Sequence, residues 1–508
     1  MRKQILAIAL GLFLTSAGLG LTACSGSGQP IDTTPTDTRI QETVIESDVV
    51  EDATAHVPEE SEEQTLADVT ETTAQDTWSE TSADTIAFVE TQTEAATELE
   101  TLPEEETVNM EEIKEDIGLD VKKSDLQGIM QYLFDSQSVT NETVMFMEKG
   151  DAKALLYPID NIISVTSYDG SIVYQEGVDY VLEDGNIRVT ENSSIPCITA
   201  NVYYNWDSNM LITEYNGKEC NTFWGELQPP KWQVCVTYTH QSAWEGYMQE
   251  CELDVYAKLV EKLQKGRDVT IFFYGDSITQ GANASYTSAP YQPPYTILFA
   301  QALADLFDYT VEYVHINLRA DNGQSVLSLP QESYVGGDGS GGTIRYVNTA
   351  IGGWTSKNGL DNISAFVLNK MELYGCDLFV VGFGMNDITT PVETTKANIK
   401  GIVDAVLAER PRVNVMLIST MVPNPDANAQ WYGNQEKQEV ALQALAREYR
   451  ASGVSCAVAC MTSVSKAVLE RKDFRDYTGN NINHPNDFFI RIYAQTLLQT
   501  LIGYENMD

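Results

Sequence analysis

Histidine and basic residues are scarce in this chain. Its 508 residues include four histidines, and 31 lysines and arginines stand against 74 aspartates and glutamates, a formal net charge of −43 at pH 7. Because phosphate binding requires positive charge, this balance argues against nucleic acid and anionic membrane surfaces as partners, and it disfavours polyanionic substrates. Neutral sugars or small neutral esters fit the composition better.

Cysteines are few and lack the spacing of a metal site. Apart from Cys24, the chain has Cys197, Cys220, Cys235, Cys251, Cys376, Cys456 and Cys460. We therefore expect no metal and no redox cofactor, and we interpret these residues as small buried hydrophobes. One or two disulfides among Cys197 to Cys251 are the alternative in an exported protein. The glycine-rich run 336–342 lacks a following Lys-Ser/Thr, so it is not a phosphate loop.

The one long apolar run lies near the amino terminus. Arg2 and Lys3 precede apolar residues from about Ile5 to Leu21, and the small residues before Cys24 resemble a bacterial lipobox. This pattern predicts a lipoprotein signal peptide over residues 1–23 and lipidation of Cys24, which would anchor an exported protein to the outer face of the bacterial cell membrane. An uncleaved anchor or an ordinary signal peptide is the alternative, and either would also export the chain.

A segment rich in threonine and acidic residues follows. Residues 31–110 contain 23 acidic residues and a single basic one, Arg39. Such a segment cannot bury enough apolar surface to offset the entropy lost on ordering. We predict a disordered acidic linker over residues 24–116.

The remaining residues predict two regions. Residues 117–249 contain short apolar or alternating runs separated by Asp-Gly and Asn-Gly turns, which predict a β-sandwich or jelly-roll-like accessory domain. Residues 250–508 alternate strand-like and helix-like runs, a pattern typical of α/β folds with a mostly parallel sheet between two helical layers.

The most informative motif follows the apolar run 269–274. There, Gly275-Asp276-Ser277 combines a buried strand with a glycine turn that would lift the Ser277 hydroxyl above the carboxyl edge of the sheet. Open α/β sheets bind their ligands at that edge. An ordinary turn is the alternative if the motif is taken alone, since all three residue types favour turns.

Three later segments supply groups that a nucleophilic serine requires. Gly353 follows a short β-like run, Asn386 follows the apolar run 378–383, and His484 lies just before a terminal helix. A glycine N–H and an asparagine amide can stabilise an oxyanion, and a histidine can accept the serine proton. His56, His240 and His315 lie in the linker or in strand-like runs, so His484 is the histidine best placed to act as base.

In these blocks, residues 265–505 resemble the SGNH, or GDSL-type, hydrolases. The resemblance implies that Ser277 is the nucleophile, that its own N–H together with Gly353 and Asn386 forms the oxyanion hole, and that His484 is the general base. The pattern differs from the Gly-x-Ser-x-Gly elbow of ordinary α/β-hydrolases.

One position departs from the family pattern. Three residues before the histidine, where the family has aspartate, this chain has Asn481. An asparagine oxygen can orient an imidazole but supplies no charge, so Asn481 is either an orienter or a bystander. Asp476 and Asp487 are alternative partners, and some SGNH-like carbohydrate esterases use a backbone carbonyl instead.

Together these features predict a surface serine esterase that removes small acyl groups, acetyl above all, from carbohydrate. The arrangement of a β-domain before an SGNH domain is similar to that of some deacetylating carbohydrate esterases. Two alternatives remain: an acyltransferase that uses the same acyl-enzyme, and a carbohydrate-binding lipoprotein whose hydrolase domain has decayed.

Overall fold

The computed structural model describes residues 129–204, 212–215, 218–221, 228–319, 325–329, 333–426 and 433–507. The predicted signal peptide, the predicted lipidation site Cys24 and the predicted linker all lie outside these residues. The described residues belong to one compact unit of the chain.

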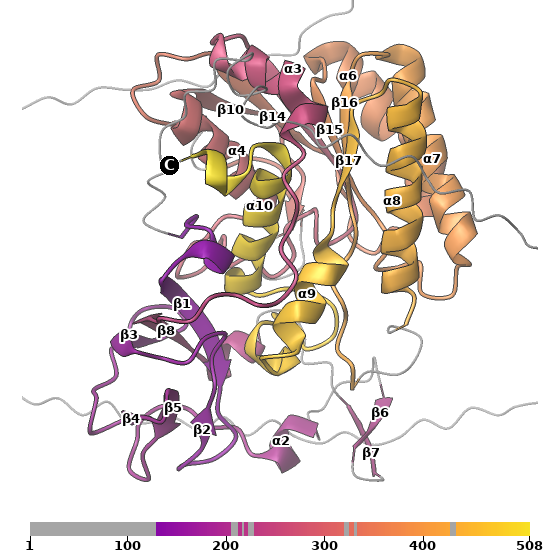
Figure 1. Cartoon of the computed structure of the whole chain (residues 1–508). Coiled ribbons are helices and arrows are strands. Elements are labelled where there is room, and N and C mark those ends of the chain that lie inside the picture. Colours follow the sequence, from indigo (N-terminus) through magenta and orange to yellow (C-terminus); the bar gives the residue numbers. More distant parts are fainter. Residues whose placement is uncertain are drawn as a thin grey trace, which may run out of the picture. The chain divides into compact units, whose positions relative to one another are not determined.

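A seven-stranded sheet forms the centre of the fold (Figure 1). Its strand order is β13-β10-β14-β9-β15-β16-β17, and every neighbouring pair is parallel except β10 and the edge strand β13. The strands are β9 (Val269–Gly275), β10 (Thr310–His315), β13 (Ser333–Val335), β14 (Thr343–Asn348), β15 (Leu378–Gly382), β16 (Asn414–Ile418) and β17 (Cys456–Ala459). The predicted mostly parallel sheet is confirmed.

The chain order places a switch point at the carboxyl end of β9. After β9 the chain adds β10 and β14 on one side of that strand, and then β15, β16 and β17 on the other. The loops after β14 and β15 therefore leave in the immediate neighbourhood of the loop after β9. In open α/β sheets such a crevice is the usual ligand site.

Both faces of the sheet are buried, because successive side chains of a strand point to opposite sides. Ile271 and Phe273 of β9 contribute to one hydrophobic cluster, and Phe272 and Tyr274 contribute to the other. Helices cover both faces (Figure 1). The α-helices are α2 (Ala200–Tyr204), α3 (Leu253–Gln264), α4 (Tyr295–Phe307), α5 (Ser356–Asp361), α6 (Asn369–Tyr374), α7 (Val392–Glu409), α8 (Gln435–Ala451), α9 (Met461–Leu469) and α10 (Asp487–Leu501).

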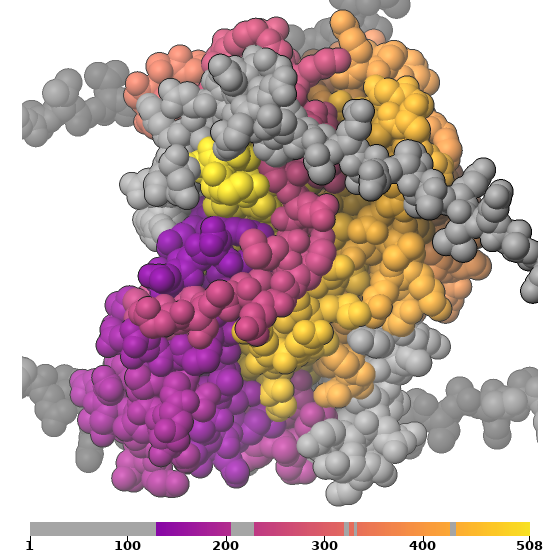
Figure 2. All heavy atoms as spheres, viewed as in Figure 1, coloured from indigo at the N-terminus to yellow at the C-terminus, as the bar shows by residue number. Residues whose placement is uncertain are grey.

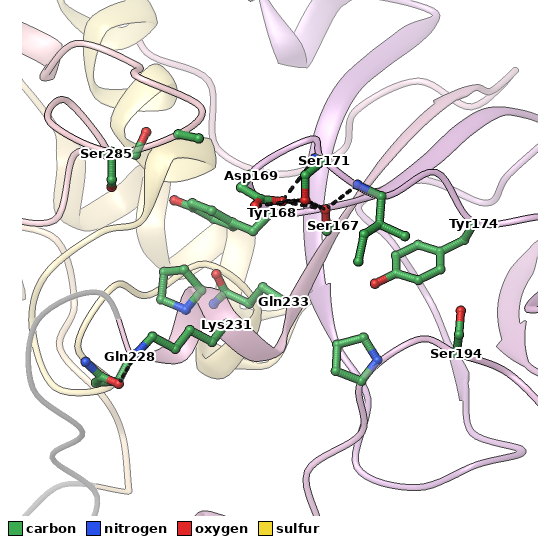
Figure 3. A pocket seen from close by; sticks show the side chains of 15 residues that line it. Ser167, Tyr168, Asp169, Ser171, Tyr174, Ser194, Gln228, Lys231, Gln233 and Ser285 are labelled. Atoms are coloured by element: carbon green, nitrogen blue, oxygen red, sulfur yellow. Dashed lines mark hydrogen bonds between the residues drawn. The ribbon is translucent and has the colours of Figure 1, made fainter. Parts of the chain in front are cut away.

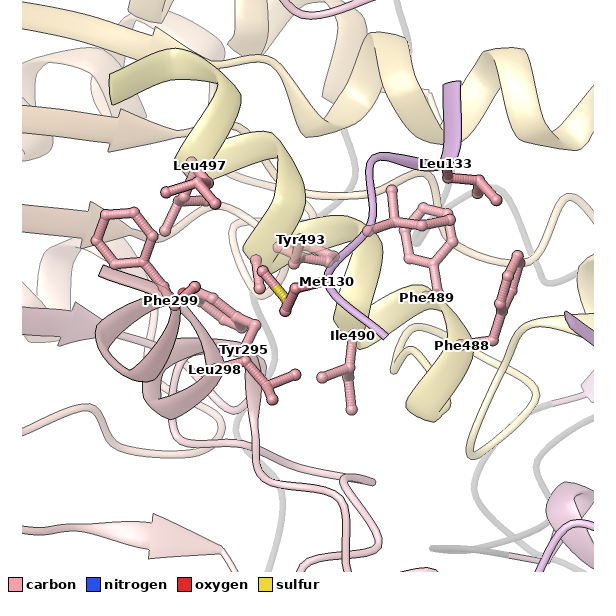
Figure 4. Close-up of a cluster of buried hydrophobic side chains, with 14 of the residues drawn as sticks. Met130, Leu133, Tyr295, Leu298, Phe299, Phe488, Phe489, Ile490, Tyr493 and Leu497 are labelled. Carbon is pink, nitrogen blue, oxygen red and sulfur yellow. The ribbon is translucent and has the colours of Figure 1, made fainter. Parts of the chain in front are cut away.

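Helix α10 is buried along its whole length. Figure 4 shows its side chains Tyr493 and Leu497 beside those of α4, and Met130 and Leu133 of the amino-terminal described segment beside the same helix. Gln495 binds that segment, since its Nε2 donates to Gln131 O at 2.8 Å. The last helix thus joins the first described residues to the sheet.

The region before α3 is built from small antiparallel sheets. One has the order β1-β8-β3, a second has the order β2-β5-β4, and β6 pairs with β7. The strands are β1 (Ser138–Met145), β2 (Ala152–Lys153), β3 (Asn161–Ser167), β4 (Tyr180–Glu183), β5 (Asn186–Val189), β6 (Ile212–Tyr215), β7 (Lys218–Asn221) and β8 (Gln233–Thr239). Residues 129–239 are called the β-rich region below.

Buried polar contacts join the β-rich region to the carboxyl-terminal part of the chain. Glu142 of β1 and Lys472 are both fully buried, and Lys472 Nζ lies 2.5 Å from Glu142 Oε1. Arg491 of α10 donates to the carbonyl oxygens of Thr140 and Asn141, at 2.9 Å each. Figure 2 shows the two parts in continuous surface contact, with the segment that follows β8 running along both.

The cysteines whose side chains are described form no disulfide. Cys235, Cys456 and Cys460 are buried, as the sequence predicts, whereas Cys197, Cys251 and Cys376 are half-buried. Within the described part of the chain, no helix is long and apolar enough to cross a membrane.

Candidate active site

Ser277 lies two residues beyond the end of β9, at the switch point. Gly275 is required there because a Cβ atom would lie 2.3 Å from Gly382 O on the neighbouring strand β15. The chain then turns tightly, with Ala282 N–H donating to Ser277 O at 2.9 Å. The Ser277 side chain is almost buried, with 3% of the residue's surface exposed.

His484 meets this serine from the carboxyl-terminal part of the chain. Its Nε2 lies 2.8 Å from Ser277 Oγ, although 207 residues separate the two in sequence. The loop around it is fixed by Asn480, whose Oδ1 accepts the backbone N–H groups of Ile482, Asn483 and His484. The structure thus brings the predicted nucleophile and the predicted base into hydrogen-bond contact.

Asn283 contacts the other ring nitrogen of this histidine. Its Oδ1 lies 2.8 Å from His484 Nδ1, and its Nδ2 donates to Gly479 O at 3.0 Å. With the amide oriented in this way, Oδ1 accepts from Nδ1–H and leaves Nε2 to accept the Ser277 proton. Gly479 permits the contact, because a Cβ there would lie 2.4 Å from Asn283 Cβ.

The sequence interpretation did not identify Asn283. It follows Ser277 by six residues, in Gly281-Ala282-Asn283, and has a φ of 65°. Asparagine tolerates this left-handed conformation better than most residues do. Its polar character next to a nucleophile turn was the available signal, but only the folded loop turns it towards His484.

Asn481 does not contact the His484 ring. Its Oδ1 accepts the Tyr203 hydroxyl at 2.6 Å, and its backbone O accepts from Asn424 Nδ2 at 2.7 Å. These hydrogen bonds hold Asn481 against Tyr203 and Asn424.

Asp476 and Asp487, the alternative partners considered for His484, accept hydrogen bonds from backbone N–H groups. Asp476 Oδ1 accepts from Met145 N–H at 2.8 Å, and Asp487 Oδ1 accepts from Ser285 N–H at 3.0 Å. Burial raises the pKa of the Asp487 carboxyl to about 6.

The predicted oxyanion donors come from the loops after β14 and β15. Gly353 is exposed and has a φ of 79°, with open space around it. Asn386 Nδ2 donates to Trp354 O at 3.0 Å, which ties the β15 loop to the glycine loop and leaves the second amide hydrogen for another acceptor. A Cβ on the neighbouring Gly352 would lie 3.6 Å from Ser277 Cβ, so the glycine loop borders the serine.

Two buried carboxyls lie beneath these loops. Asp387 accepts from Ser356 N–H at 2.9 Å and from Ser356 Oγ at 2.6 Å, which holds the start of α5 behind the glycine loop. Asp276 Oδ1 accepts from Ile278 N–H at 3.0 Å. Burial, with the charge of Asp387 in addition, raises the pKa of the Asp276 carboxyl to about 7.

The β-rich region holds the loop that carries His484. Gln233 of β8 donates from Nε2 to Arg475 O at 2.7 Å and to Thr478 O at 2.9 Å. Its Oε1 accepts from Asn486 Nδ2 at 2.9 Å, and Asn486 in turn caps the amino terminus of α10. Both ends of the histidine loop are therefore fixed by one buried side chain of the β-rich region.

The described part of the chain contains no group of three or more His, Cys, Asp or Glu residues that would hold a metal ion. The arrangement of Ser277, His484 and Asn283 is that of a nucleophile, a base and an orienting group, with the base within hydrogen-bond distance of the other two.

One family model matches part of this chain. Residues 273–488 match the sequence model of the GDSL-like Lipase/Acylhydrolase family. No curated protein matches the sequence.

Several solved structures are similar. One is a two-domain esterase (CEX) active on acetylated mannans, co-crystallized with mannopentaose. The two sequences are 22% identical, the match covers 51% of this chain and 56% of that chain, and the TM-score is 0.34. Another is an acetyl xylan esterase. It is 17% identical, the match covers 46% of this chain and 98% of that chain, and the TM-score is 0.31. A third is a carbohydrate esterase family 3 protein from Talaromyces cellulolyticus. It is 18% identical, the match covers 46% of this chain and 97% of that chain, and the TM-score is 0.31. The chain spans little more than half the length of the two-domain esterase.

Proposed function

We propose that this protein, whose residues 273–488 match the sequence model of the GDSL-like Lipase/Acylhydrolase family, is a serine esterase that removes small acyl groups, acetyl above all, from carbohydrate. The observation that carries the proposal is the 2.8 Å contact between Ser277 Oγ and His484 Nε2, with Asn283 at the opposite ring nitrogen.

The proposed reaction has two halves. Ser277 Oγ attacks the ester carbonyl carbon while His484 Nε2 takes the hydroxyl proton, and the imidazolium then gives that proton to the departing sugar hydroxyl. The acyl group remains on Ser277. In the second half, His484 takes a proton from a water molecule whose oxygen attacks the acyl carbon. The imidazolium then returns that proton to Ser277 Oγ as the bond between Oγ and the acyl carbon breaks and the carboxylic acid is released.

Negative charge develops on the carbonyl oxygen in both halves. The donors proposed for it are the N–H groups of Ser277 and Gly353 and the second amide hydrogen of Asn386. Donors held in place before the reaction stabilise such charge without the cost of reorganising solvent. The contact from Asn386 to Trp354 O supports this role, because it fixes the amide beside the glycine loop.

The substrate class rests on exposure and charge. The near-complete burial of Ser277 favours a small acyl group over a long chain. The net charge of −43 disfavours a polyanionic substrate, which leaves neutral glycans as the favoured alcohol part.

Replacement of the nucleophile tests the proposal. We expect Ser277→Ala to lower acetate release from a chromogenic acetate ester and from acetylated polysaccharides by at least about 10⁴-fold, with an unchanged unfolding temperature, because the oxygen that carries the acyl group is removed. Acetate release at the wild-type rate by this variant would refute the mechanism. A product in which the acyl group appears on a second sugar would instead indicate acyl transfer.

We also propose that the protein is exported and lipid-anchored through Cys24. The apolar run 5–21 and the small residues before Cys24 support this. In the bacterial host, Cys24→Ala should move the protein from the membrane fraction to the soluble or medium fraction, because the acyl chains would be missing. Retention of the variant in the membrane fraction would contradict the anchor.

A further inference from the structure

A cleft of about 740 Å³ lies where the β-rich region meets the loop that follows the nucleophile turn. Figure 3 shows Tyr168, Ser171, Ser194 and Lys231 on the side of the β-rich region and Ser285 on the other side. We name it the Tyr168 cleft. Its volume falls in the range of small-molecule sites, roughly 300 to 1,000 Å³.

The walls of the Tyr168 cleft are held by hydrogen bonds within the protein. Asp169 accepts from Ser171 N–H at 3.1 Å and from Ser171 Oγ at 2.8 Å, which fixes the turn after β3. Opposite, Ser285 Oγ accepts from Gln292 N–H at 3.1 Å. A cleft with walls fixed in this way spares a ligand much of the entropy cost of ordering them.

The cleft adjoins the proposed active site through covalent and hydrogen-bonded neighbours. Ser285, on one wall, is two residues from Asn283, which contacts His484. Tyr168, on the other wall, accepts at its hydroxyl from Asp487 N–H at 2.9 Å, three residues beyond His484. The two walls of the cleft therefore lie on, or donate or accept hydrogen bonds with, segments within three residues of Asn283 and His484.

The lining matches an uncharged, hydroxyl-rich ligand. Ser171, Ser194 and Ser288 line the cleft. The hydroxyls of Ser171 and Ser194 donate to Asp169 and Asp179, so their oxygens can accept a hydrogen bond from a ligand hydroxyl. Tyr168, with Pro196 and Pro230, adds apolar surface suited to the C–H faces of sugar rings.

The charged groups of the cleft point to the same class. Lys231 and Asp169 contribute one charge of each sign, and Lys231 Nζ donates to Gln228 Oε1 at 2.7 Å. An anionic ligand would call for a cluster of cations rather than one balanced pair.

We propose that the Tyr168 cleft binds neutral sugar units of the glycan that carries the scissile ester, so that the β-rich region supplies part of the substrate site. This assignment rests on the proposed esterase function for its link to catalysis. Glycan binding at the cleft is itself measurable without turnover.

One substitution on each wall tests the proposal. Ser171→Trp fills the cleft from the β-rich region, and Ser288→Trp fills it from the nucleophile-side loop. Ser333→Trp, at an exposed position on β13 outside the cleft, is the matched control. For each full-length variant, kcat/KM is measured on acetylated xylo- and manno-oligosaccharides and on a chromogenic acetate ester, with the unfolding temperature as a check of folding.

We expect both cleft variants to lower the ratio of oligosaccharide to chromogenic-ester kcat/KM by at least tenfold, and the control to leave that ratio unchanged. In parallel, calorimetry measures binding of xylopentaose, mannopentaose and cellopentaose to Ser277→Ala protein, with and without each tryptophan. At least one pentaose should bind, and either cleft substitution should weaken it at least tenfold.

Two results would overturn the proposal: no pentaose binds, or binding and the kcat/KM ratio both survive the two cleft substitutions in folded protein. A wild-type protein that cleaves no ester but binds a pentaose in a cleft-dependent way would refute the esterase function while supporting the cleft as a glycan site. The two failures are thus distinguishable.

Discussion

At the residue scale, a neutral amide takes the position beside the base that is more often held by a carboxylate. Asn283 fixes the His484 ring by accepting from Nδ1–H, yet it adds no charge to stabilise an imidazolium. The proposed esterase would therefore depend on geometry and on its oxyanion donors more than on the charge of a third group.

Deleting this amide should slow the reaction without straining the backbone. We expect Asn283→Gly to lower kcat on a chromogenic acetate ester by at least about fivefold, since one orienting hydrogen bond is worth about 1 kcal/mol or more. Glycine suits the φ of 65° at this position, which alanine would not. Steady-state kinetics on folded protein measure the change in kcat.

Asn283→Asp is the matched comparison. It keeps an acceptor for Nδ1–H, tolerates the same φ and adds a charge that favours the imidazolium, so its kcat should exceed that of Asn283→Gly. Equal rates for wild type and Asn283→Gly would show that the contact does not orient His484 during turnover.

At the element scale, three neighbouring strand ends and one loop build the site. The ends of β9, β14 and β15 bring Ser277, Gly353 and Asn386 to one edge of the sheet. The histidine loop comes from elsewhere and is held by β8 through Gln233. The β-rich region is thus a structural part of the histidine side of the site.

Removing the Gln233 amide should disturb catalysis as well as stability. Gln233→Met keeps the side-chain length but removes the donor to the carbonyls of Arg475 and Thr478 in a buried site, so we expect a loss of at least about 2 kcal/mol in the free energy of unfolding. The kcat on a small acetate ester should fall several-fold with little change in KM, because the variant misplaces His484 rather than the ester.

The exposed Gln241→Met provides the same chemical change at the surface and should leave both quantities near wild type. Urea unfolding and steady-state kinetics supply the measurements. A Gln233→Met protein that loses stability but keeps its wild-type kcat would reduce Gln233 to a purely structural residue.

At the scale of the whole molecule, the carboxylates set a pH dependence of stability. The pKa of Asp276 is raised to about 7 and that of Asp487 to about 6, both chiefly by burial. An unfolded aspartate titrates near 3.9. Between these values the folded state binds more protons than the unfolded state, so these two groups lower stability as the pH rises from about 4 through 7.

Asp276→Asn should flatten that dependence. The change keeps the hydrogen bond to Ile278 N–H but removes the buried titrating group, so its free energy of unfolding should fall less between pH 5 and pH 8 than that of wild type. The difference is at most about 3 kcal/mol, because only about two of the three pKa units lie above pH 5 and each is worth roughly 1.4 kcal/mol. Urea unfolding at several pH values measures it, with the exposed Asp254→Asn as control. Parallel curves for Asp276→Asn and wild type would rule out this contribution.

A buried ion pair also joins the β-rich region to the carboxyl-terminal part of the chain. The buried pair of Glu142 and Lys472 has its remaining groups satisfied, since Glu142 also accepts from Leu156 N–H and the Tyr238 hydroxyl. Breaking such a pair leaves an unpaired buried charge, which is strongly destabilising. The β-rich region and the sheet are therefore coupled through their interior.

The amino-acid sequence by itself determined the mostly parallel sheet and the positions of Ser277, Gly353, Asn386 and His484 in their turns, because strand patterns and turn residues act over a few neighbours. Only the tertiary structure decided that Asn283 rather than Asn481 meets the His484 ring. Only the tertiary structure likewise shows the hydrogen bonds from Gln233 to the loop that carries His484, and the Tyr168 cleft. These features join side chains many residues apart or depend on a left-handed turn, and local pattern carries no information about which distant groups the packed chain brings together.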